Sequence, residues 1–196
     1  DFTCGLGIDS FFISQNAKMV KSFDINEKVA EIANENYKRL NQTNITAFQG
    51  DSTEIAKNIK EQISACFIDP SRRDKTDSSS RLYSLESCEP DVKIIIDSIK
   101  DKANFLIVKA SPMIDITQTI KYIDEISDIW IISIKNDCKE LLFKVDFKQK
   151  TEKISLHTIN YENSKVETFD SIFRNNDSSS KFVTPEIGNY LYLPNS

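Results

Sequence analysis

Short apolar segments alternate with amphipathic segments over the first two thirds of the chain. The apolar segments predict strands at residues 19–25, 44–48, 65–68, 103–109 and 128–134. Between them, apolar residues recur at helical spacing and predict helices at residues 26–40, 52–62, 90–100 and 115–126. Strands that alternate with helices pair in parallel, and the helices cover both faces of the sheet. The pattern therefore predicts an α/β fold with a Rossmann-like, doubly wound and mostly parallel sheet.

The pattern changes toward the end of the chain. Residues 153–161 and 165–173 alternate apolar and polar side chains around a polar turn, which predicts an antiparallel C-terminal hairpin. Residues 137–147 fit neither pattern well, and we expect a helical turn at their start. The first residues read as the end of a strand, so we expect a truncated first strand. We therefore expect one domain over residues 1–174 and a linker into a further domain over residues 175–196.

Composition narrows the class of protein. The chain has 196 residues, 39% of them hydrophobic, and a net charge of -5. The hydrophobic content is sufficient for a packed core. The negative net charge argues against a uniformly basic surface that binds nucleic acid, but it is compatible with a local basic patch. No apolar run approaches the ~20 residues that a membrane span needs. Four scattered cysteines without metal-ligand spacing are typical of reduced thiols, so we expect a cytoplasmic protein without a metal site.

Candidate chemistry gathers where the predicted strands end. The chain opens with a Gly-x-Gly turn at Gly5 and Gly7, where backbone can approach a ligand closely. Carboxylates stand at successive strand ends: Asp1, Asp24, Asp51 and Asp69. In parallel sheets these ends meet along one edge, where ligands bind. Four like charges together favour a ligand rich in hydrogen-bond donors, such as ribose hydroxyls, an amino group and an adenine amine.

In these residues the chain resembles the class I S-adenosylmethionine-dependent methyltransferases, from residue 1 to about residue 161. The resemblance implies that Asp1 and the glycine turn hold the methionine end of the cofactor and that Asp24 binds its ribose. It assigns Asp51 and Ser52 to the adenine. The predicted cofactor-binding residues are Asp1, Cys4, Gly5, Gly7, Asp24, Ile25, Asp51, Ser52 and Asp69.

Asp69 and Pro70 stand where amino-group methyltransferases carry their Asp/Asn-Pro-Pro-aromatic motif. The resemblance implies that both are catalytic. The Asp69 carboxylate and the Pro70 carbonyl would accept hydrogen bonds from an amine and turn its lone pair toward the methyl group. Ser71 follows Pro70, so the aromatic residue of that motif is absent. Stacking on a base would come from an arginine or from Tyr83, or the acceptor is not a base.

A finer resemblance extends to bacterial methyltransferases with a THUMP-like domain, related to cap-guanine hypermethylases. It rests on residues 68–74, 108–113, 136–140 and 190–195. It implies an RNA substrate and a THUMP-like domain after residue 196. Candidate substrate-binding residues are Arg72, Arg73, Lys109 and Ser111. The arginines suit phosphate contact or loop anchoring equally, and the stretch around Ser111 suits a plain turn as well as substrate contact.

Other interpretations stay open at this point. A Gly-x-Gly turn with Asp24 also fits a nicotinamide cofactor, but an enzyme that uses that cofactor does not need Asp1, Asp51 and Asp69 together. The acceptor could be a protein or a metabolite, or the chain could bind the cofactor without catalysis. We expect Cys4 to serve packing, Trp130 to lie in the core, and the only histidine, His157, to have no catalytic role. The sequence predicts no oligomeric state.

Overall fold

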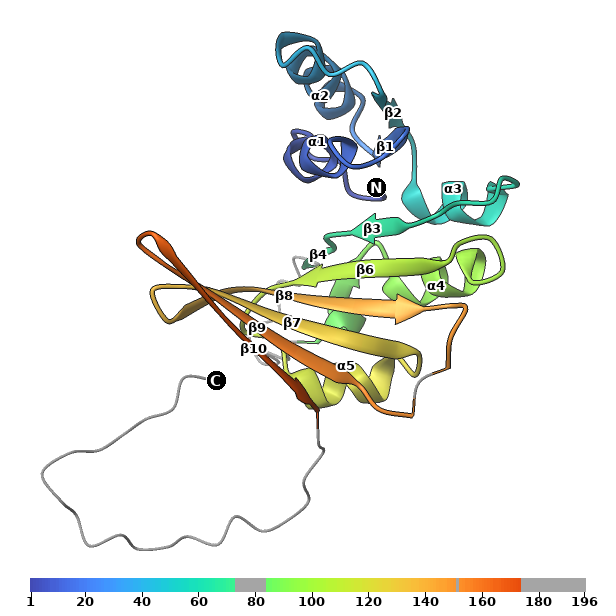
Figure 1. The fold of residues 1–196 in the computed structure, drawn as a ribbon. Helices are drawn as coiled ribbons and strands as arrows, with labels where there is room; N and C mark the ends of the chain where they lie inside the picture. The colour runs from blue at the N-terminus through green and yellow to red at the C-terminus, as the bar shows by residue number, and fades with distance from the viewer. Residues whose placement is uncertain (73–83, 151, 174–196) are drawn as a thin grey trace, which may run out of the picture.

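The structure is a computed structural model and describes residues 1–72, 84–150 and 152–173. Five α-helices occur within these ranges (Figure 1): α1 (Ile8–Ser14), α2 (Glu27–Arg39), α3 (Ser52–Asn58), α4 (Val92–Ile99) and α5 (Ile116–Tyr122). The described strands are β1 (Val20–Asp24), β2 (Ile45–Gln49), β3 (Cys66–Ile68), β4 (Ser71–Arg72), β5 (Cys88–Glu89), β6 (Phe105–Ala110), β7 (Ile126–Ile134), β8 (Asp137–Asp146), β9 (Ser155–Glu162) and β10 (Lys165–Ile172). A short 3-10 helix, Leu85–Ser87, precedes β5.

Residues 1–4 form hydrogen bonds with two separate groups of strands. One group is the parallel pair β1 and β2, and the other is a six-stranded sheet in the order β10-β9-β7-β8-β6-β3. The Phe2 amide donates to the Phe67 carbonyl of β3 at 2.9 Å, and the Cys4 amide donates to the Phe23 carbonyl of β1 at 2.8 Å. Residues 1–4 therefore lie between β1 and β3, as expected for the end of a strand.

The predicted α/β class is confirmed, with a sheet that is mixed. β3 and β6 pair in parallel, whereas β8 lies antiparallel between β6 and β7. The helical turn expected at the start of residues 137–147 is wrong, because those residues form β8. The cause is a tight turn at Lys135 and Asn136, which take positive φ angles of 51° and 62° and return the chain directly as a strand.

The C-terminal hairpin agrees with its prediction. β9 and β10 pair antiparallel over eight residues each, and β9 continues the sheet by pairing in parallel with β7. Several helices are shorter than expected, and α1 was not predicted at all. Asp91 caps α4 by accepting from the Lys93 and Ile94 amides, so the helix begins at Val92 rather than at the preceding proline.

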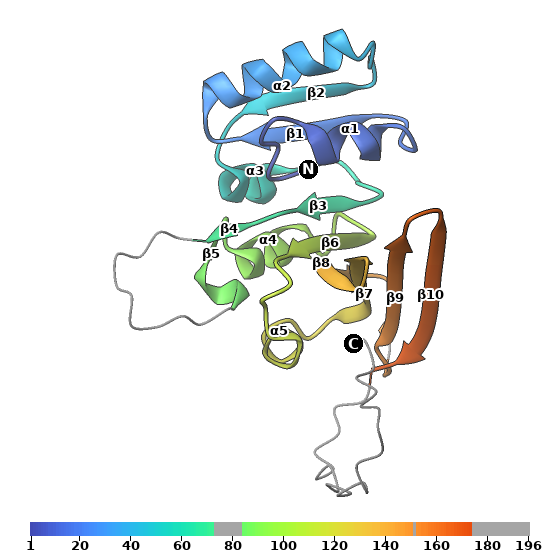
Figure 2. The ribbon, with the colours of Figure 1, turned by 90° about the vertical axis from the view of Figure 1, so that its left-hand side faces the viewer.

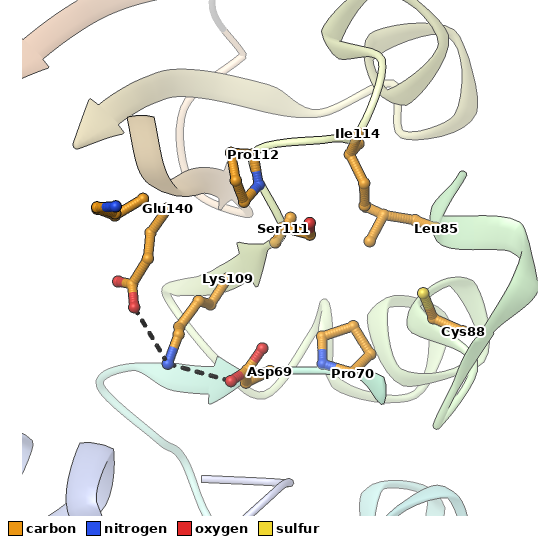
Figure 3. Close-up of a pocket in the computed structure, with 11 residues that line it drawn as sticks. Asp69, Pro70, Leu85, Cys88, Lys109, Ser111, Pro112, Ile114 and Glu140 are labelled. Atoms are coloured by element: carbon orange, nitrogen blue, oxygen red, sulfur yellow. Dashed lines mark ion pairs between the residues drawn. The ribbon is translucent and has the colours of Figure 1, made fainter. Parts of the chain in front are cut away.

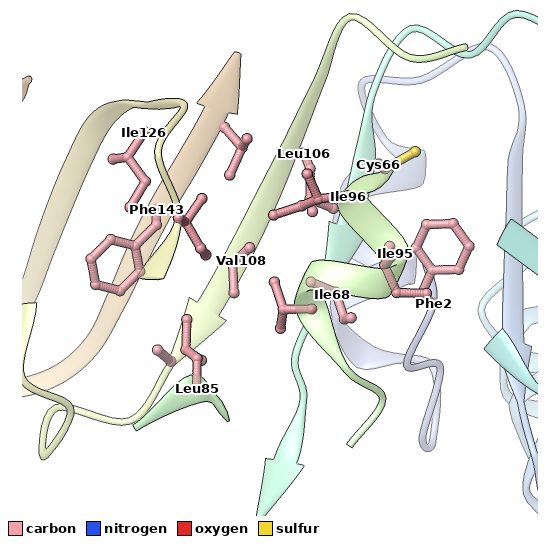
Figure 4. Close-up of a cluster of buried hydrophobic side chains, with 14 of the residues drawn as sticks. Phe2, Cys66, Ile68, Leu85, Ile95, Ile96, Leu106, Val108, Ile126 and Phe143 are labelled. Atoms are coloured by element: carbon pink, nitrogen blue, oxygen red, sulfur yellow. The ribbon is translucent and has the colours of Figure 1, made fainter. Parts of the chain in front are cut away.

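The larger hydrophobic cluster lies between the sheet and the helices α3 and α4 (Figure 4). Alternate residues of β6 and β8 point into it, among them Leu106, Val108 and Phe143, and each is fully buried. Ile95 of α4 packs onto the same cluster. Burying one such side chain contributes roughly 1.5–3 kcal/mol, so this cluster fixes the register of the central strands.

A smaller cluster lies between β1, β2 and the helices α1 and α2, and includes Val20, Ala33, Tyr37 and Ala47. Helices thus cover both faces of the sheet, which is the doubly wound arrangement (Figure 2). The expectation that Trp130 lies in the core is wrong. Its side chain is only partly buried and lies on the face of the sheet opposite the larger cluster, where its ring stacks on His157 with the ring centroids 5.0 Å apart. Among the described helices, none is both long and apolar enough to cross a membrane.

Candidate cofactor and acceptor site

Three of the residues predicted at the strand ends, Asp1, Asp24 and Asp69, are connected by hydrogen bonds through residues 1–5. The Gly5 amide donates to Asp24 Oδ2 at 3.0 Å, and the Thr3 amide donates to Asp1 Oδ1 at 2.8 Å. The Asp69 amide donates to Thr3 Oγ1 at 2.7 Å. The chain therefore supplies backbone donors to carboxylates whose charges would otherwise repel one another.

The glycine turn is shaped by α2. Gly7 has a φ of 86° and caps α1, and a Cβ at this position would lie 2.5 Å from the hydroxyl of Tyr37. The Asn36 side-chain amide of the same helix donates to the Leu6 carbonyl at 3.0 Å. Gly5 also has a positive φ, of 51°, but a Cβ there would meet nothing within 4 Å. Gly7 is thus required for close packing, whereas Gly5 is required only for its backbone conformation.

Asp24 ends β1, and its side chain lies beside the turn. Its Oδ1 accepts from the Asn26 amide at 2.9 Å, while Oδ2 accepts from Gly5. Two apolar side chains flank this part of the edge, and they are largely exposed: Leu6 at 54% and Ile25 at 71%. A carboxylate between exposed apolar side chains fits a ribose with a flat heterocycle attached, which is the chemistry of an adenosyl group.

Asp51 and Ser52 both have structural partners. Asp51 caps α3, accepting from the Thr53 amide at 2.7 Å, and remains exposed. The Ser52 hydroxyl is buried and donates to the Phe2 carbonyl. Ser52 therefore holds residues 1–4 in place, and the side chain available for a ligand from this pair is Asp51.

Cys4 lies behind the turn rather than on its open side. Its thiol is 4% exposed and lies 3.5 Å from the Tyr37 hydroxyl, which also contacts the Ser22 hydroxyl at 3.3 Å. Burial raises the pKa of Tyr37 to about 12, so this hydroxyl stays neutral. Cys4 packs as expected, and only its backbone faces the turn.

A cavity of about 330 Å³ opens beside Asp69 (Figure 3). Asp69 and Pro70 form part of its wall, together with Ser111 after β6 and Glu140 of β8. The remaining lining residues are Leu85, Cys88, Lys109, Ala110, Pro112, Ile114 and Lys139. The wall is thus apolar on one side, and charged groups of both signs stand on the other. No described lining residue is aromatic.

Lys109 of β6 stands at the centre of the charged side. Its ammonium group lies 3.1 Å from Asp69 Oδ2 and 3.0 Å from Asp9 Oδ2 on α1. Glu140 Oε1 lies 3.7 Å away. Desolvation by itself would lower the pKa of Lys109, but the hydrogen bonds that its ammonium donates to Asp9 and Asp69 outweigh desolvation, and the pKa is raised. Lys109 is therefore a permanent cation and not a base.

The other predicted substrate-binding residues are placed only in part. Ser111 lines the cavity, and its hydroxyl accepts from the Met113 amide at 3.3 Å, so it serves the turn and faces the cavity as well. Arg72 is the last residue of β4, where it pairs with Cys88 of β5. Arg73 and Tyr83 lie outside the described residues.

Sequence reasoning missed the residues that support the site. They are Thr3, Asp9, Ser10, Tyr37 and Glu140. Ser10 donates to Asp1, and Asp9 pairs with Lys109, both from the unpredicted α1. Asp9 and Ser10 directly follow the glycine turn, and polar residues of these types at that place could have predicted the start of a helix.

His157 lies far from this edge in the fold. It bridges Asp170 of β10 and Asp128 of β7, at 2.6 Å and 3.3 Å, and the hydrogen bond to Asp170 raises its pKa. It has no part in the candidate site. Within the described ranges, no three side chains of the ligating types are grouped so as to hold a metal ion.

Comparisons with known proteins agree with this fold. No protein-family model matches the sequence, and no curated protein matches it. A solved structure from Porphyromonas gingivalis W83, described as a candidate methyltransferase, matches with a TM-score of 0.74 and 25% identity. The match covers 88% of this chain and 43% of that one, so the chain spans less than half of that protein's length.

Two further structures are similar in fold. An rRNA methylase from Streptococcus thermophilus matches with a TM-score of 0.51 and 16% identity, over 74% of this chain and 82% of that one. M. capricolum TrmK, solved in complex with S-adenosyl-homocysteine, has a TM-score of 0.51 and 15% identity, over 84% of this chain and 63% of that one. The chain therefore has a methyltransferase fold, with a mixed sheet and the glycine turn at its carboxyl edge.

Proposed function

We propose that the chain binds S-adenosylmethionine and is the catalytic domain of a methyltransferase. The observation that carries this proposal is the arrangement of Asp1, Asp24 and Asp69 around one glycine turn, next to a cavity that Asp69 lines. Carboxylates suit the amino group and ribose hydroxyls of this cofactor, and the exposed Leu6 and Ile25 suit its adenine. The fold shared with methyltransferase structures supports the same assignment.

The chemistry divides between cofactor and protein. The bound cofactor would supply an electrophilic methyl group on a sulfonium centre. The protein then needs to orient the acceptor and exclude water. The Asp69 carboxylate and the Pro70 carbonyl, both in the cavity wall, accept hydrogen bonds from the acceptor amine and orient its lone pair. After transfer the acceptor nitrogen is cationic and releases a proton to solvent.

We further propose a nitrogen atom of RNA as the acceptor, in a cytoplasmic protein. Arg72 and Arg73 adjoin the cavity wall in sequence, and adjacent arginines suit phosphate contact. Two proteins of similar fold are described as an rRNA methylase and as TrmK. The resemblance to THUMP-like-domain methyltransferases also supports RNA. In this proposal residues 1–174 form the methyltransferase domain and residues 175–196 lead into a THUMP-like domain.

A protein or metabolite acceptor is the second candidate. It is favoured by the absence of an aromatic residue among the described residues that line the cavity, because base recognition commonly relies on aromatic stacking. The acidic net charge of -5 favours it as well.

Calorimetry tests the cofactor assignment. The chain should bind S-adenosylhomocysteine, and Asp24→Asn should weaken binding about a hundredfold, because the amide offers one acceptor fewer to the ribose. Asp97→Asn is the matched control, since Asp97 is an exposed residue of α4 that pairs with Lys100 and is not among the residues that line the cavity. Equal affinities in all three proteins would refute the cofactor site.

Label transfer tests the acceptor. The protein is incubated with methyl-labelled S-adenosylmethionine and with separate fractions of total RNA, protein and small metabolites. Label in the RNA fraction, lost on digestion with ribonuclease, is expected. Label only in protein or metabolites would establish the second candidate, and binding of the cofactor without any label transfer would indicate a non-catalytic module.

A further inference from the structure

The ion pairs of Lys109 connect the two halves of the candidate site. Asp9 belongs to α1, which begins directly after the glycine turn. Asp69 ends β3 and lines the cavity, and Glu140 stands near the start of β8 across from it. One ammonium group therefore contacts the cofactor side and both walls of the acceptor side. Residues of four separate segments meet at this single atom.

The environment of Lys109 makes these ion pairs stronger than ordinary surface pairs. Its side chain is 18% exposed, compared with 39% for Asp9, 40% for Asp69 and 44% for Glu140. Charges partly shielded from water are screened less by solvent and salt. Without the ammonium group, three carboxylates would face one another across a few ångströms, which favours rotation of their side chains away from one another.

The contact also selects one orientation of Asp69. Lys109 contacts Oδ2, while among the described residues no donor reaches Oδ1. With Oδ2 fixed, Oδ1 is the oxygen left to accept a hydrogen bond from an acceptor in the cavity. Asp9, on α1, contacts the same ammonium group at 3.0 Å.

We propose that Lys109 is a positioning residue, which fixes the Asp69 carboxylate toward the acceptor cavity and couples it through Asp9 to the helix that forms the cofactor turn. This inference rests on the proposed function. It replaces the expectation that Lys109 binds substrate, because its ammonium group is already engaged by three carboxylates of the chain itself.

Two variants and a matched control test the coupling by calorimetry with S-adenosylhomocysteine. Lys109→Gln removes the charge and should weaken binding about tenfold. Lys109→Arg keeps the charge and should stay within about threefold of the wild type. Lys144→Gln is the control, because Lys144 of β8 also bridges two carboxylates, Asp128 and Asp146, yet lies away from the cavity. It should leave affinity unchanged.

A spectroscopic measurement follows Lys109 itself. In protein labelled with ¹⁵N-lysine, an ammonium held by carboxylates exchanges slowly with water, and its NMR signal persists near neutral pH. The signal lost in Lys109→Arg identifies Lys109. Asp69→Asn and Asp9→Asn should each shift or broaden it, whereas Asp97→Asn should not. A merely structural lysine elsewhere on the sheet would not respond to these two substitutions.

The outcomes separate the two proposals. If the wild type fails to bind S-adenosylhomocysteine, the proposed function fails and the coupling fails with it. If the wild type binds but Lys109→Gln binds equally well, or if Lys109→Arg is as weak as Lys109→Gln, only the positioning role is overturned. An ammonium signal unaffected by Asp69→Asn would overturn it as well.

Discussion

The two halves of the candidate site are built by different means. On the cofactor side, Asp1, Asp24 and Asp51 each accept hydrogen bonds from backbone amides two to nineteen residues away. On the acceptor side, Asp69 and Glu140 are held by one lysine side chain. Backbone amides are fixed once the local fold forms, whereas an ammonium on a flexible stem can be removed or replaced by a ligand.

We therefore expect substitutions on the two sides to affect different properties: the stability of the fold on the cofactor side, and the choice of acceptor on the other side. Substitutions on the cofactor side should disturb the fold, because the backbone donors there belong to residues 3–5 and to the first turn of α3. Damage to the acceptor side should leave the fold intact and change what happens in the cavity. The predictions below test this division, beginning with the largest expected effect.

Asp69→Asn should separate the two halves most clearly. The amide retains one acceptor oxygen but loses the charge that pairs with Lys109, so methyl transfer should fall about 100-fold to 1000-fold. Affinity for S-adenosylhomocysteine should stay within about threefold, as measured by calorimetry next to a label-transfer assay. Undiminished transfer would show that Asp69 does not orient the acceptor.

Gly7→Ala should destabilise the fold more than Gly5→Ala. Both residues have positive φ angles, which cost about 1 kcal/mol for a residue with a side chain. At Gly7 the added Cβ also lies 2.5 Å from the Tyr37 hydroxyl, which adds roughly 1–3 kcal/mol. Urea denaturation of the two variants measures the difference. Equal losses would mean that Tyr37 moves aside without cost.

Tyr37 should make stability depend on pH in alkaline solution. Its folded-state pKa is raised to about 12 by burial, so the unfolded tyrosine ionises first, near pH 10. The neutral hydroxyl therefore stabilises the fold below pH 10, and roughly 2 kcal/mol is lost as the pH rises from 10 to 12. Tyr37→Phe should lack this loss. Denaturation curves of both proteins across this range test it, and identical slopes would contradict it.

The smallest effect is expected at the C-terminal hairpin. Hydrogen bonding to Asp170 raises the pKa of His157, so the charged form stabilises the hairpin below the ordinary histidine pKa. That stabilisation is lost as the pH rises through the folded-state pKa. The rate of hydrogen exchange at β10 amides should therefore increase above neutral pH by more than the intrinsic exchange rate increases over the same pH range. In His157→Gln this excess should vanish, while the candidate site stays unaffected.

The parts of the fold that sequence predicted share a local cause. The strand at residues 65–68, the Gly5–Gly7 turn and the hairpin at residues 153–173 all depend on patterns within a few residues. The cofactor edge followed from these, because strand ends in a parallel sheet meet on one side. Residues 174–196 lie outside the described residues, so the linker and the further domain stay predictions.

The parts that sequence could not predict depend on distant contacts. Nothing local marks Glu140 as a neighbour of Asp69, because the two meet only after β8 has inserted between β6 and β7. Lys109 resembles any lysine at a strand end until Asp9 and Asp69 are placed beside it. The sequence did not predict β8, because its first residues, Asp137 to Lys139, are largely polar and the alternating apolar pattern of a strand begins only after them.

The reversed direction of β8 has a consequence for how this protein could diversify. A strand running opposite to β6 begins near the end of β6, so the first residues of β8, among them Lys139 and Glu140, line the cavity. The turn that joins β7 to β8 is anchored to the neighbouring β9, where the Lys135 amide donates to the Tyr161 carbonyl at 2.9 Å. Substitutions at the start of β8 would therefore change the wall of the cavity without disturbing the buried layer beneath, and the glycine turn on the other side of Lys109 would stay the same.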